Sequence, residues 1–189
     1  DGSTLNFIKQ NSCLKHFTGL DISGNYLDKT KQLVGCDTVK GSILDGRFVE
    51  RHKGCFDYCT LGAVLHHLIG ENRSESFSLA RTCLQNSLKL LKPGGALIIF
   101  EPTHGPSFLM DIIFWIKKII GNFTDRRLEF SQRWANFGQP VVSYYTPTQL
   151  LSFINELPDG KIVSKTIVDD TRLGFVIHRV GMGIVVERS

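Results

Sequence analysis

Two carboxylate side chains follow predicted strands, and such positions favour chemistry. Glu101 follows the continuous apolar run from Ala96 to Phe100, which is typical of a strand covered on both faces. The broken segment from Pro102 to Pro106 comes next, so we expect the strand to end at Glu101. Asp21 closes an earlier predicted strand over 16–23. Ligands in open α/β sheets lie outside the carboxyl ends of the strands, so both carboxylates are candidate site residues.

The cysteines and histidines suggest a metal site as an alternative. Cys55 and Cys59 share a predicted strand, and a Cys-x-x-x-Cys spacing on a strand provides no chelating turn. We therefore expect no metal, although His16, His66 and His67 could add ligands. The five cysteines are odd in number and lie mostly in apolar sequence, which indicates reduced core residues of a cytoplasmic protein.

The motif LKPGG stands directly before the strand that carries Glu101. Pro93 cannot continue a helix and restricts the residue before it, so the predicted helix over 77–91 must stop there. Gly94 and Gly95 allow the positive φ values of a tight reversal. The motif therefore predicts a helix, a turn and a buried strand in succession.

Strand and helix alternate through the first half, which predicts a parallel sheet built from right-handed crossovers. A polar loop is predicted between the second and third of these strands. One predicted helix begins at Ser3 or Thr4, and two others cover 26–34 and 77–91. The predicted strands cover 16–23, 36–40 and 56–60, and the predicted loop covers 41–53.

The second half departs from this alternation. Residues 107–120 are strongly apolar, and Thr146 and Pro147 suit the N-cap and the first position of a helix. Two β-rich runs near the end predict an antiparallel pair with a turn between them. The runs are 161–168 and 174–186, and the predicted turn is Asp169–Asp170.

The bulk composition sets limits on function. With 189 residues, 42% hydrophobic and 21% charged, the chain suits one globular domain, with or without a lid. A net charge of +4 is too small to indicate nucleic-acid binding by itself. No apolar run reaches the roughly 20 residues of a membrane span, and the first residues predict no signal peptide.

Several motifs, in their order and spacing, resemble the class I S-adenosylmethionine-dependent methyltransferases over nearly the whole chain. LKPGGALIIFEP at 91–102 is the most specific match. The others are the end of a glycine-rich loop at 1–4, GLDIS at 19–23, FDYCTLGAVLHHL at 56–68 and YYTPTQL at 144–150.

The resemblance implies an α/β, Rossmann-like doubly wound fold. Its sheet would be mostly parallel, with an antiparallel C-terminal strand and a helical insert after the LKPGG strand. Residues 1–189 would form one domain, with 102–143 as an insert or lid over the acceptor pocket. The family's first strand and most of its glycine-rich loop have no counterpart, so we expect that this sequence begins inside the cofactor motif.

The resemblance also implies S-adenosylmethionine as the cofactor and S-adenosylhomocysteine as the product. Asp1 and Gly2 would belong to the loop whose backbone approaches the ligand. Asp21, with Ile22 beside it, would accept hydrogen bonds from both ribose hydroxyls.

The residue that reads the adenine stays open between two alternatives. Ser42 and Ile43 could serve through a hydroxyl and the backbone, or Asp45 could reach in. The segment that follows the fourth strand of the family fold resembles the family's contact with the methionine part of the cofactor. A plain strand-to-helix turn explains this segment nearly as well. This segment is Thr60, Leu61 and Gly62.

The implied reaction is displacement at an activated methyl group, so alignment is the main task of the protein. A base is needed only when the acceptor carries a proton. Glu101 and His104 are the candidates, with a structural hydrogen bond as the alternative role of Glu101. His66 and His67 are further candidates, but we favour a packing role for this pair.

The insert indicates the kind of acceptor. Its apolar part could cover a pocket for a small, apolar or lipid-like molecule, with a plain amphipathic helix as the alternative. Three basic residues could face an anionic group or a membrane surface, so peripheral membrane contact through 107–133 is a hypothesis. They are Arg126, Arg127 and Arg133.

Two other functional classes compete with a small-molecule methyltransferase. A non-catalytic methyltransferase-like scaffold would explain the absent glycine-rich loop. A nicotinamide-dependent oxidoreductase would also place an acidic residue such as Asp21 after its second strand. The LKPGG motif and the antiparallel ending favour the methyltransferase, and protein or nucleic-acid substrates are not expected. The oligomeric state is not indicated.

Overall fold

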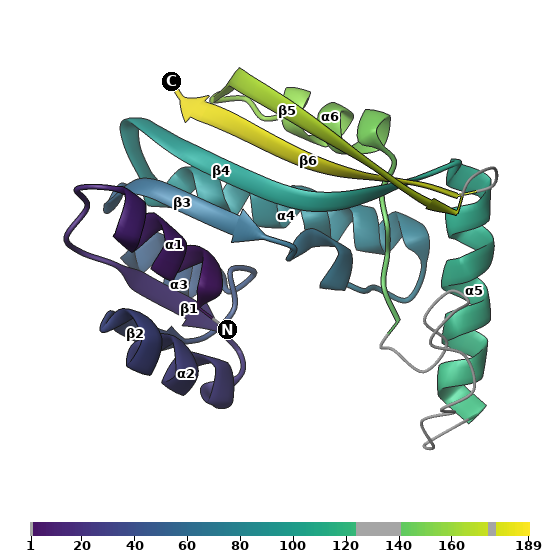
Figure 1. The fold of residues 1–189 in the computed structure, drawn as a ribbon, viewed down its shortest axis with the longest axis horizontal. Coiled ribbons are helices and arrows are strands. Elements are labelled where there is room, and N and C mark those ends of the chain that lie inside the picture. The colour runs from purple at the N-terminus through teal and green to yellow at the C-terminus, as the bar shows by residue number, and fades with distance from the viewer. Residues whose placement is uncertain (1, 124–140, 174–176) are drawn as a thin grey trace. The chain divides into compact units, whose positions relative to one another are not determined.

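The computed structural model describes residues 2–123, 141–173 and 177–189, and Figure 1 shows the course of the chain. Two compact units, Asp1–Lys53 and Gly54–Ser189, divide the chain, and each is described by itself. Helices and strands alternate in the first unit and in the first half of the second, so the predicted α/β class is confirmed.

The first unit is a short parallel sheet with three helices. β1 and β2 pair in parallel, and Asp21 lies opposite Lys40, so both strands end at one edge. α1 packs on α2, and α2 packs on both strands. The elements are α1 Ser3–Asn11, β1 Thr18–Asp21, α2 Gly24–Val34, β2 Asp37–Lys40 and α3 Gly46–Arg51.

The second unit is a mixed four-stranded sheet in the order β3-β4-β6-β5. β3 and β4 are parallel, whereas β6 pairs antiparallel with both β4 and β5, as predicted for the C-terminal strands. In Figure 1, α5 stands at the end where β4 finishes. The elements are β3 Phe56–Gly62, η1 Leu65–His67, α4 Arg73–Leu90, β4 Leu91–Gly105, α5 Ser107–Phe123, α6 Pro147–Asn155, β5 Gly160–Leu173 and β6 Ile177–Arg188.

The core of the second unit lies between its sheet and two helices. α4 contacts β3, β4 and α6, while α6 contacts β4, β5 and β6. Along β4, Leu97 and Ile99 are fully buried, but Phe100 is 48% exposed. This alternation shows that β4 is less evenly covered than the continuous apolar run predicted.

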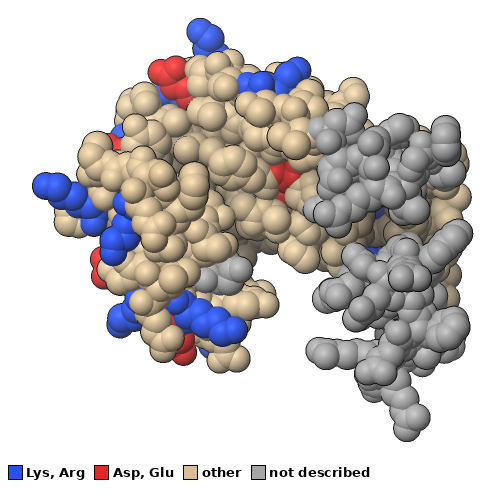
Figure 2. Space-filling view, viewed as in Figure 1, with Lys and Arg blue, Asp and Glu red and all other residues tan. Residues whose placement is uncertain are grey.

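Much of the face drawn in Figure 2 is uncharged, and its lysines and arginines lie in separate small groups.

The capping box of α6 confirms the predicted start of this helix. The Thr146 hydroxyl accepts a hydrogen bond from the Gln149 N–H at 3.2 Å, and the Gln149 side chain accepts one from the Thr146 N–H at 2.9 Å. Pro147 occupies the first helical turn, where its missing N–H is not needed.

The predicted end of β4 at Glu101 is wrong, because the strand continues to Gly105. Pairing with β6 runs past Pro102 to Gly105, and Tyr145 bridges to Thr103 from the other side. Partners on both sides therefore keep this part of the chain extended despite its proline.

Two predicted connections are also wrong. The predicted polar loop contains α3, because Asp45 caps a helical turn that is too short to show an apolar period. Asp169 and Asp170 lie within β5, opposite Val180 and Arg179, rather than in a turn. Parallel pairing is also less dominant than predicted, since the described strand pairs are two parallel and two antiparallel.

The cysteines are free thiols, but they are not all core residues. Cys36 and Cys83 are buried, whereas Cys13 and Cys55 are exposed, which corrects part of the prediction. Burial raises the pKa of Cys59 to about 11 and that of Cys83 to about 12. Within the described ranges, no group of three potential ligands could hold a metal ion, and no helix is long and apolar enough to cross a bilayer.

Candidate active site

The end of β1 places Asp21 beside the loop that follows β2. The Gly41 N–H donates a hydrogen bond to the Asp21 carbonyl at 3.0 Å, which joins the two strand ends. Ser42 follows directly in the chain. The structure therefore brings the predicted cofactor residues Asp21 and Ser42 to the same edge of the first unit.

The Asp21 carboxylate keeps spare acceptor capacity. Its Oδ1 accepts a hydrogen bond from the Ser23 N–H at 2.8 Å, a local turn that orients the side chain. Within the part of the chain that the structure describes, this is the only hydrogen bond of that carboxylate, so Oδ2 is open to ligand donors. Ile22, next in the chain, is 72% exposed and adds an apolar surface.

Gly2 begins α1 in a conformation that side-chain-bearing residues rarely adopt. Its φ is 79°, and a Cβ at this position would lie 2.9 Å from the Cα of Thr30 on α2. Glycine is therefore required both by the backbone angle and by the close packing of α1 on α2. No side chain of the described residues caps this N-terminus, whose N–H groups favour negative charge. Asp1 lies outside the described residues.

Both side chains predicted to read the adenine make local hydrogen bonds. The Ser42 hydroxyl accepts from the Leu44 N–H at 3.1 Å. The Asp45 carboxylate caps α3 by accepting from the Arg47 N–H at 2.9 Å. Ile43 lies between them and is partly exposed. These hydrogen bonds hold the loop in one conformation, and the choice between Ser42 and Asp45 stays a prediction.

β3 ends in a strained turn. Leu61 is buried, so only its backbone could meet a ligand, whereas Gly62 is exposed and Thr60 is partly exposed. Ala63 follows with a φ of 54°, and its N–H donates to the Phe100 carbonyl at 2.7 Å. A non-glycine residue in the left-handed region costs energy, and such strain clusters at functional sites.

Glu101 is buried beneath this turn and is 2% exposed. Its Oε2 accepts from the Leu65 N–H at 3.3 Å, and its Oε1 accepts from the His66 N–H at 3.0 Å. The His66 ring adds a third contact through Nδ1, 2.5 Å from Oε1. The carboxylate thus joins β4 to the turn after β3, as in the structural alternative considered for Glu101.

His104 lies beside the same turn, on the far side of an aromatic ring. Its N–H donates to the Tyr145 carbonyl at 2.8 Å, and its ring centroid is 4.0 Å from that of Tyr144. Tyr144 in turn stacks on His66 at 5.5 Å. The structure therefore gathers Glu101, His66, Tyr144 and His104 into one cluster.

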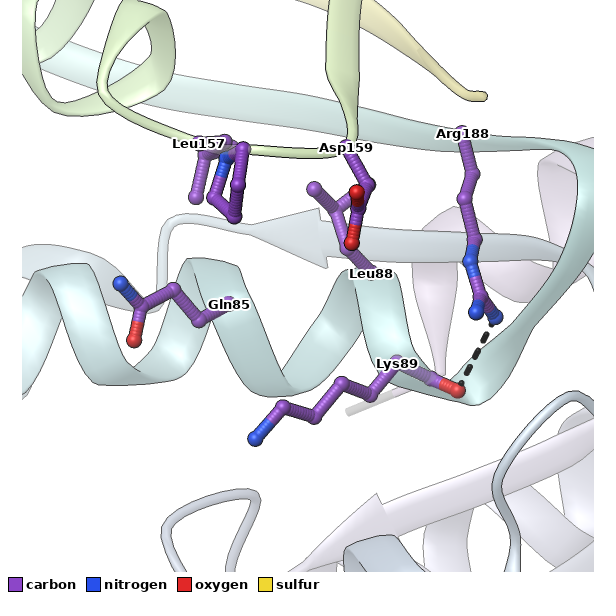
Figure 3. A pocket seen from close by; sticks show the side chains of 7 residues that line it. Gln85, Leu88, Lys89, Leu157, Asp159 and Arg188 are labelled. Atoms are coloured by element: carbon purple, nitrogen blue, oxygen red, sulfur yellow. Dashed lines mark hydrogen bonds between the residues drawn. The ribbon is translucent and has the colours of Figure 1, made fainter.

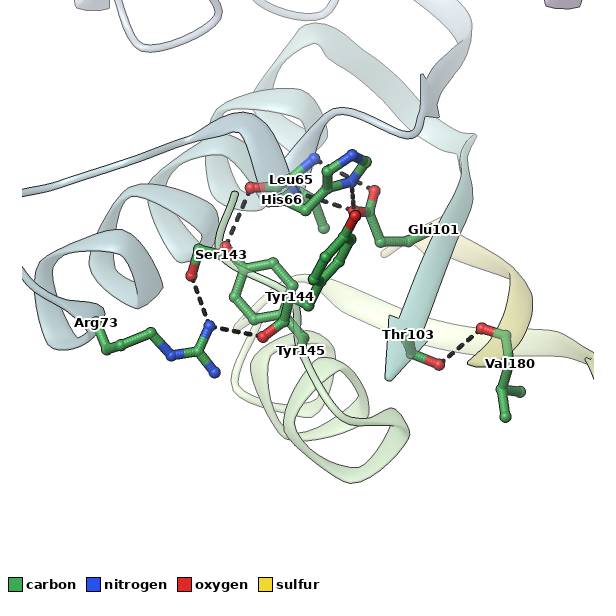
Figure 4. Close-up of polar contacts among 9 residues, drawn as sticks. All are labelled: Leu65, His66, Arg73, Glu101, Thr103, Ser143, Tyr144, Tyr145 and Val180. Atoms are coloured by element: carbon green, nitrogen blue, oxygen red, sulfur yellow. Dashed lines mark hydrogen bonds and ion pairs between the residues drawn. The ribbon is translucent and has the colours of Figure 1, made fainter. Parts of the chain in front are cut away.

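The extended segment before α6 forms the wall of this cluster (Figure 4). The Ser143 N–H donates to the His66 carbonyl at 2.8 Å, and the Tyr145 hydroxyl donates to the Leu65 carbonyl at 3.1 Å. Arg73 fixes the segment by donating to the Ser143 hydroxyl at 2.9 Å. Burial raises the pKa of Tyr145, so its hydroxyl stays a neutral donor.

Comparison with known families decides which family the chain represents. Residues 1–99, just over half of the 189, match the family described as "Methyltransferase domain". The chain belongs to this family. No curated protein sequence matches it.

Several solved structures with the same fold are described as methyltransferases. A putative methyltransferase from Bacillus halodurans C-125 is 10% identical, with a TM-score of 0.65 over 99% of this chain and 87% of that one. A SAM-dependent methyltransferase from Methanosarcina mazei is 15% identical, with a TM-score of 0.63 over 98% and 86%. The N-methyltransferase NodS from Bradyrhizobium japonicum WM9, in complex with S-adenosyl-L-homocysteine, is 12% identical, with a TM-score of 0.57 over 99% and 72%. The predicted class I methyltransferase fold is confirmed, and the cofactor of this class is S-adenosylmethionine.

The first unit of this methyltransferase fits the nucleoside part of such a cofactor. The free Oδ2 of Asp21 can accept hydrogen bonds from a ribose diol, and exposed Ile22 can pack against the sugar or the base. In the second unit, exposed Gly62 lets the backbone approach a ligand. The residues present are therefore compatible with the cofactor.

His66 is a candidate site residue that the sequence analysis placed behind Glu101 and His104. Its periodic apolar surroundings favoured a packing role, yet its ring Nδ1 lies 2.5 Å from the Glu101 carboxylate. The parallel pairing of β3 and β4 could have indicated this contact. Gly62 pairs with Phe100, so the residues that follow Gly62 and those that follow Phe100 lie at the same edge of the sheet.

A separate cavity of the methyltransferase lies at the other end of β4 (Figure 3). It holds about 230 Å³ and lies between the last turn of α4, the start of β5 and the end of β6. Arg188 donates to the Lys89 carbonyl at its side. Ligands of open α/β sheets bind outside the carboxyl ends of the strands, so this cavity is not the candidate active site.

Proposed function

We propose that the protein transfers the methyl group of S-adenosylmethionine to a small, apolar acceptor. Its family is that of a methyltransferase domain. When bound, the cofactor supplies a methyl group on a positively charged sulfur, ready for displacement. The residues of the protein then have to align the acceptor and exclude water.

The exposed face of α5 carries the acceptor part of the proposal. This helix is apolar on both sides: Met110 and Phe114 are buried, while other large apolar residues remain exposed. They recur at helical spacing along one stripe: Phe108, Ile112, Trp115, Ile116 and Ile119. A contiguous stripe of exposed apolar side chains favours contact with an apolar ligand over contact with water.

Hydrogen bonds link the first turns of α5 to the segment before α6, which forms the wall of the cluster around His66. Asp111 pairs with Arg73 at 2.9 Å, and Arg73 donates to the Tyr144 carbonyl at 2.6 Å. The Gln149 side chain also donates to the Ser107 hydroxyl at 3.0 Å. A molecule held against α5 would therefore lie near the wall that carries Tyr144.

Membrane contact through 107–133 remains a second hypothesis for the same stripe. The arginines considered for it, Arg126, Arg127 and Arg133, lie outside the described residues. Sedimentation with neutral and anionic liposomes tests it. Recovery of the protein in the pellet supports membrane contact, and its absence from both pellets removes the hypothesis.

Turnover with a matched pair of variants tests the acceptor class. We expect Ile112→Gln to raise KM for apolar phenols about fivefold, because part of the roughly 1.5–3 kcal/mol of side-chain burial is lost. Val163→Gln on β5 is the control, since both residues are 50% exposed. Equal KM values for the two variants, or turnover of polar acceptors alone, would contradict an apolar acceptor on α5.

A further inference from the structure

The hydrogen bonds of Glu101 determine which nitrogen of His66 carries the proton. An ionised carboxylate can only accept, so Nδ1 has to donate to Oε1 across their 2.5 Å contact. In a neutral imidazole, the other nitrogen then bears the lone pair. Figure 4 shows that this nitrogen, Nε2, points away from Glu101.

Packing holds the ring of His66 in this orientation. It lies 4.1 Å from the His67 ring and stacks on Tyr144 with an interplanar angle of 24°. The side chains of His66 and Glu101 are 8% and 0% exposed. Its backbone is fixed from both sides, by Glu101 at the N–H and by the Ser143 N–H at the carbonyl. No large rearrangement is needed before a proton is transferred.

The turn also places His66 next to the segment expected to meet the reacting end of the cofactor. Thr60 to Gly62 resemble the part that contacts the methionine group, and His66 stands on the next turn of the same unit. The strained backbone of Ala63 connects the two. A base at Nε2 would therefore stand close to the methyl group.

We infer that His66 is the general base of the methyl transfer, that Glu101 is its positioning residue, and that the acceptor presents a hydroxyl group. This inference rests on the proposed function. As the acceptor oxygen forms its bond to the methyl carbon, its proton passes to Nε2, and the carbon–sulfur bond breaks with its electron pair left on sulfur. The resulting imidazolium is stabilised by the Glu101 carboxylate at Nδ1. A carboxylate or thiolate acceptor would need no such base.

Several titratable groups surround the ring of His66. Glu101 from β4 is its partner, and the others come from the same turn, from the end of β4 and from the segment before α6. Desolvation lowers the pKa of His67, the neighbouring His66 lowers it further, and Glu101 acts in the opposite direction. Glu101, His67 and Tyr144 contact the ring, and His104, Tyr145 and Arg73 lie behind them.

Kinetics of the full protein with an apolar phenol separate this inference from the proposed function. We expect His66→Asn to lower kcat at least 100-fold, the lower range of general-base effects, and to change S-adenosylhomocysteine affinity less than twofold. His52→Asn is the control, because its Nδ1 contacts the Phe48 carbonyl on α3 instead of a carboxylate. A kcat of His66→Asn within threefold of the control overturns the base. Wild-type protein without S-adenosylhomocysteine binding would instead overturn the proposed function.

Nitrogen NMR of the histidine rings gives a readout that does not depend on turnover. We expect His66 to carry its proton on Nδ1 in the wild type. In Glu101→Gln kcat should fall, because a neutral amide stabilises the imidazolium less than the carboxylate does. Glu101→Asp should restore part of kcat, which a purely structural role would not produce. A proton on Nε2 in the neutral wild-type ring would overturn the assignment.

Discussion

Asp21 and Glu101 are both carboxylates that follow apolar strand residues, yet their surroundings are opposite. Asp21 is partly exposed and accepts one hydrogen bond from the described residues. Glu101 is buried and accepts at both oxygens, from two backbone N–H groups and one ring. A carboxylate with free acceptor capacity can bind a ligand, whereas one whose oxygens already accept hydrogen bonds from the protein stabilises the fold. The position of a carboxylate after a strand therefore predicts a candidate site residue, and the hydrogen bonds that it makes indicate whether its role is binding or structural.

The largest effect should come from removing the buried carboxylate. We expect Glu101→Ala to lower the free energy of unfolding by about 3 kcal/mol, because it leaves a histidine and two N–H groups buried without their acceptor. Urea unfolding measures this loss. Glu187→Ala, an exposed carboxylate on β6, is the control and should change stability by less than about 0.5 kcal/mol. Equal effects of the two variants would remove the contrast between Asp21 and Glu101.

The next effect concerns the first unit, which carries Asp21. We expect Gly2→Ala to cost about 1–2 kcal/mol of stability, because alanine is strained at positive φ. A Cβ would also press on Thr30. Gly24→Ala is the matched control, since a Cβ at Gly24 meets nothing within 4 Å. Thermal unfolding of both variants measures the difference, and a Gly2 variant as stable as the Gly24 variant would contradict the observed packing of α1.

The smallest effect separates a cap from a ligand contact. Asp45→Ala and Thr146→Ala each remove a helix N-cap, so each should lower stability by about 1 kcal/mol. If Asp45 serves only as a cap, both variants bind S-adenosylhomocysteine with wild-type affinity in calorimetry. A tenfold weaker affinity for Asp45→Ala alone would make Asp45 the adenine reader and leave Ser42 with the structural role.

Local chemistry explains which parts of the fold could be predicted. The stop of α4 before Pro93 and the start of α6 at Thr146 follow from backbone rules that involve neighbouring residues only. The fold class followed from alternation and from family motifs. These features do not depend on which distant segments meet.

The features that were missed depend on long-range partners. β4 continues beyond Glu101 because β6 pairs with it, and no pattern within the segment shows this. Asp169 and Asp170 favour a turn locally, but their pairing with β6 keeps them extended. The partner of His66 is 35 residues away in the chain, so the apolar period around it could not show the buried pair.

The most direct test is calorimetric titration of S-adenosylhomocysteine into Asp21→Ala and Glu101→Gln side by side. Hydrogen bonds to a charged group contribute about 1.5–3 kcal/mol each, so we expect Asp21→Ala to weaken binding at least tenfold. Glu101→Gln should bind within twofold of the wild type, because its carboxylate holds the turn rather than the cofactor. Unchanged affinity in Asp21→Ala, or a greater loss in Glu101→Gln, would contradict the division of roles between the two carboxylates.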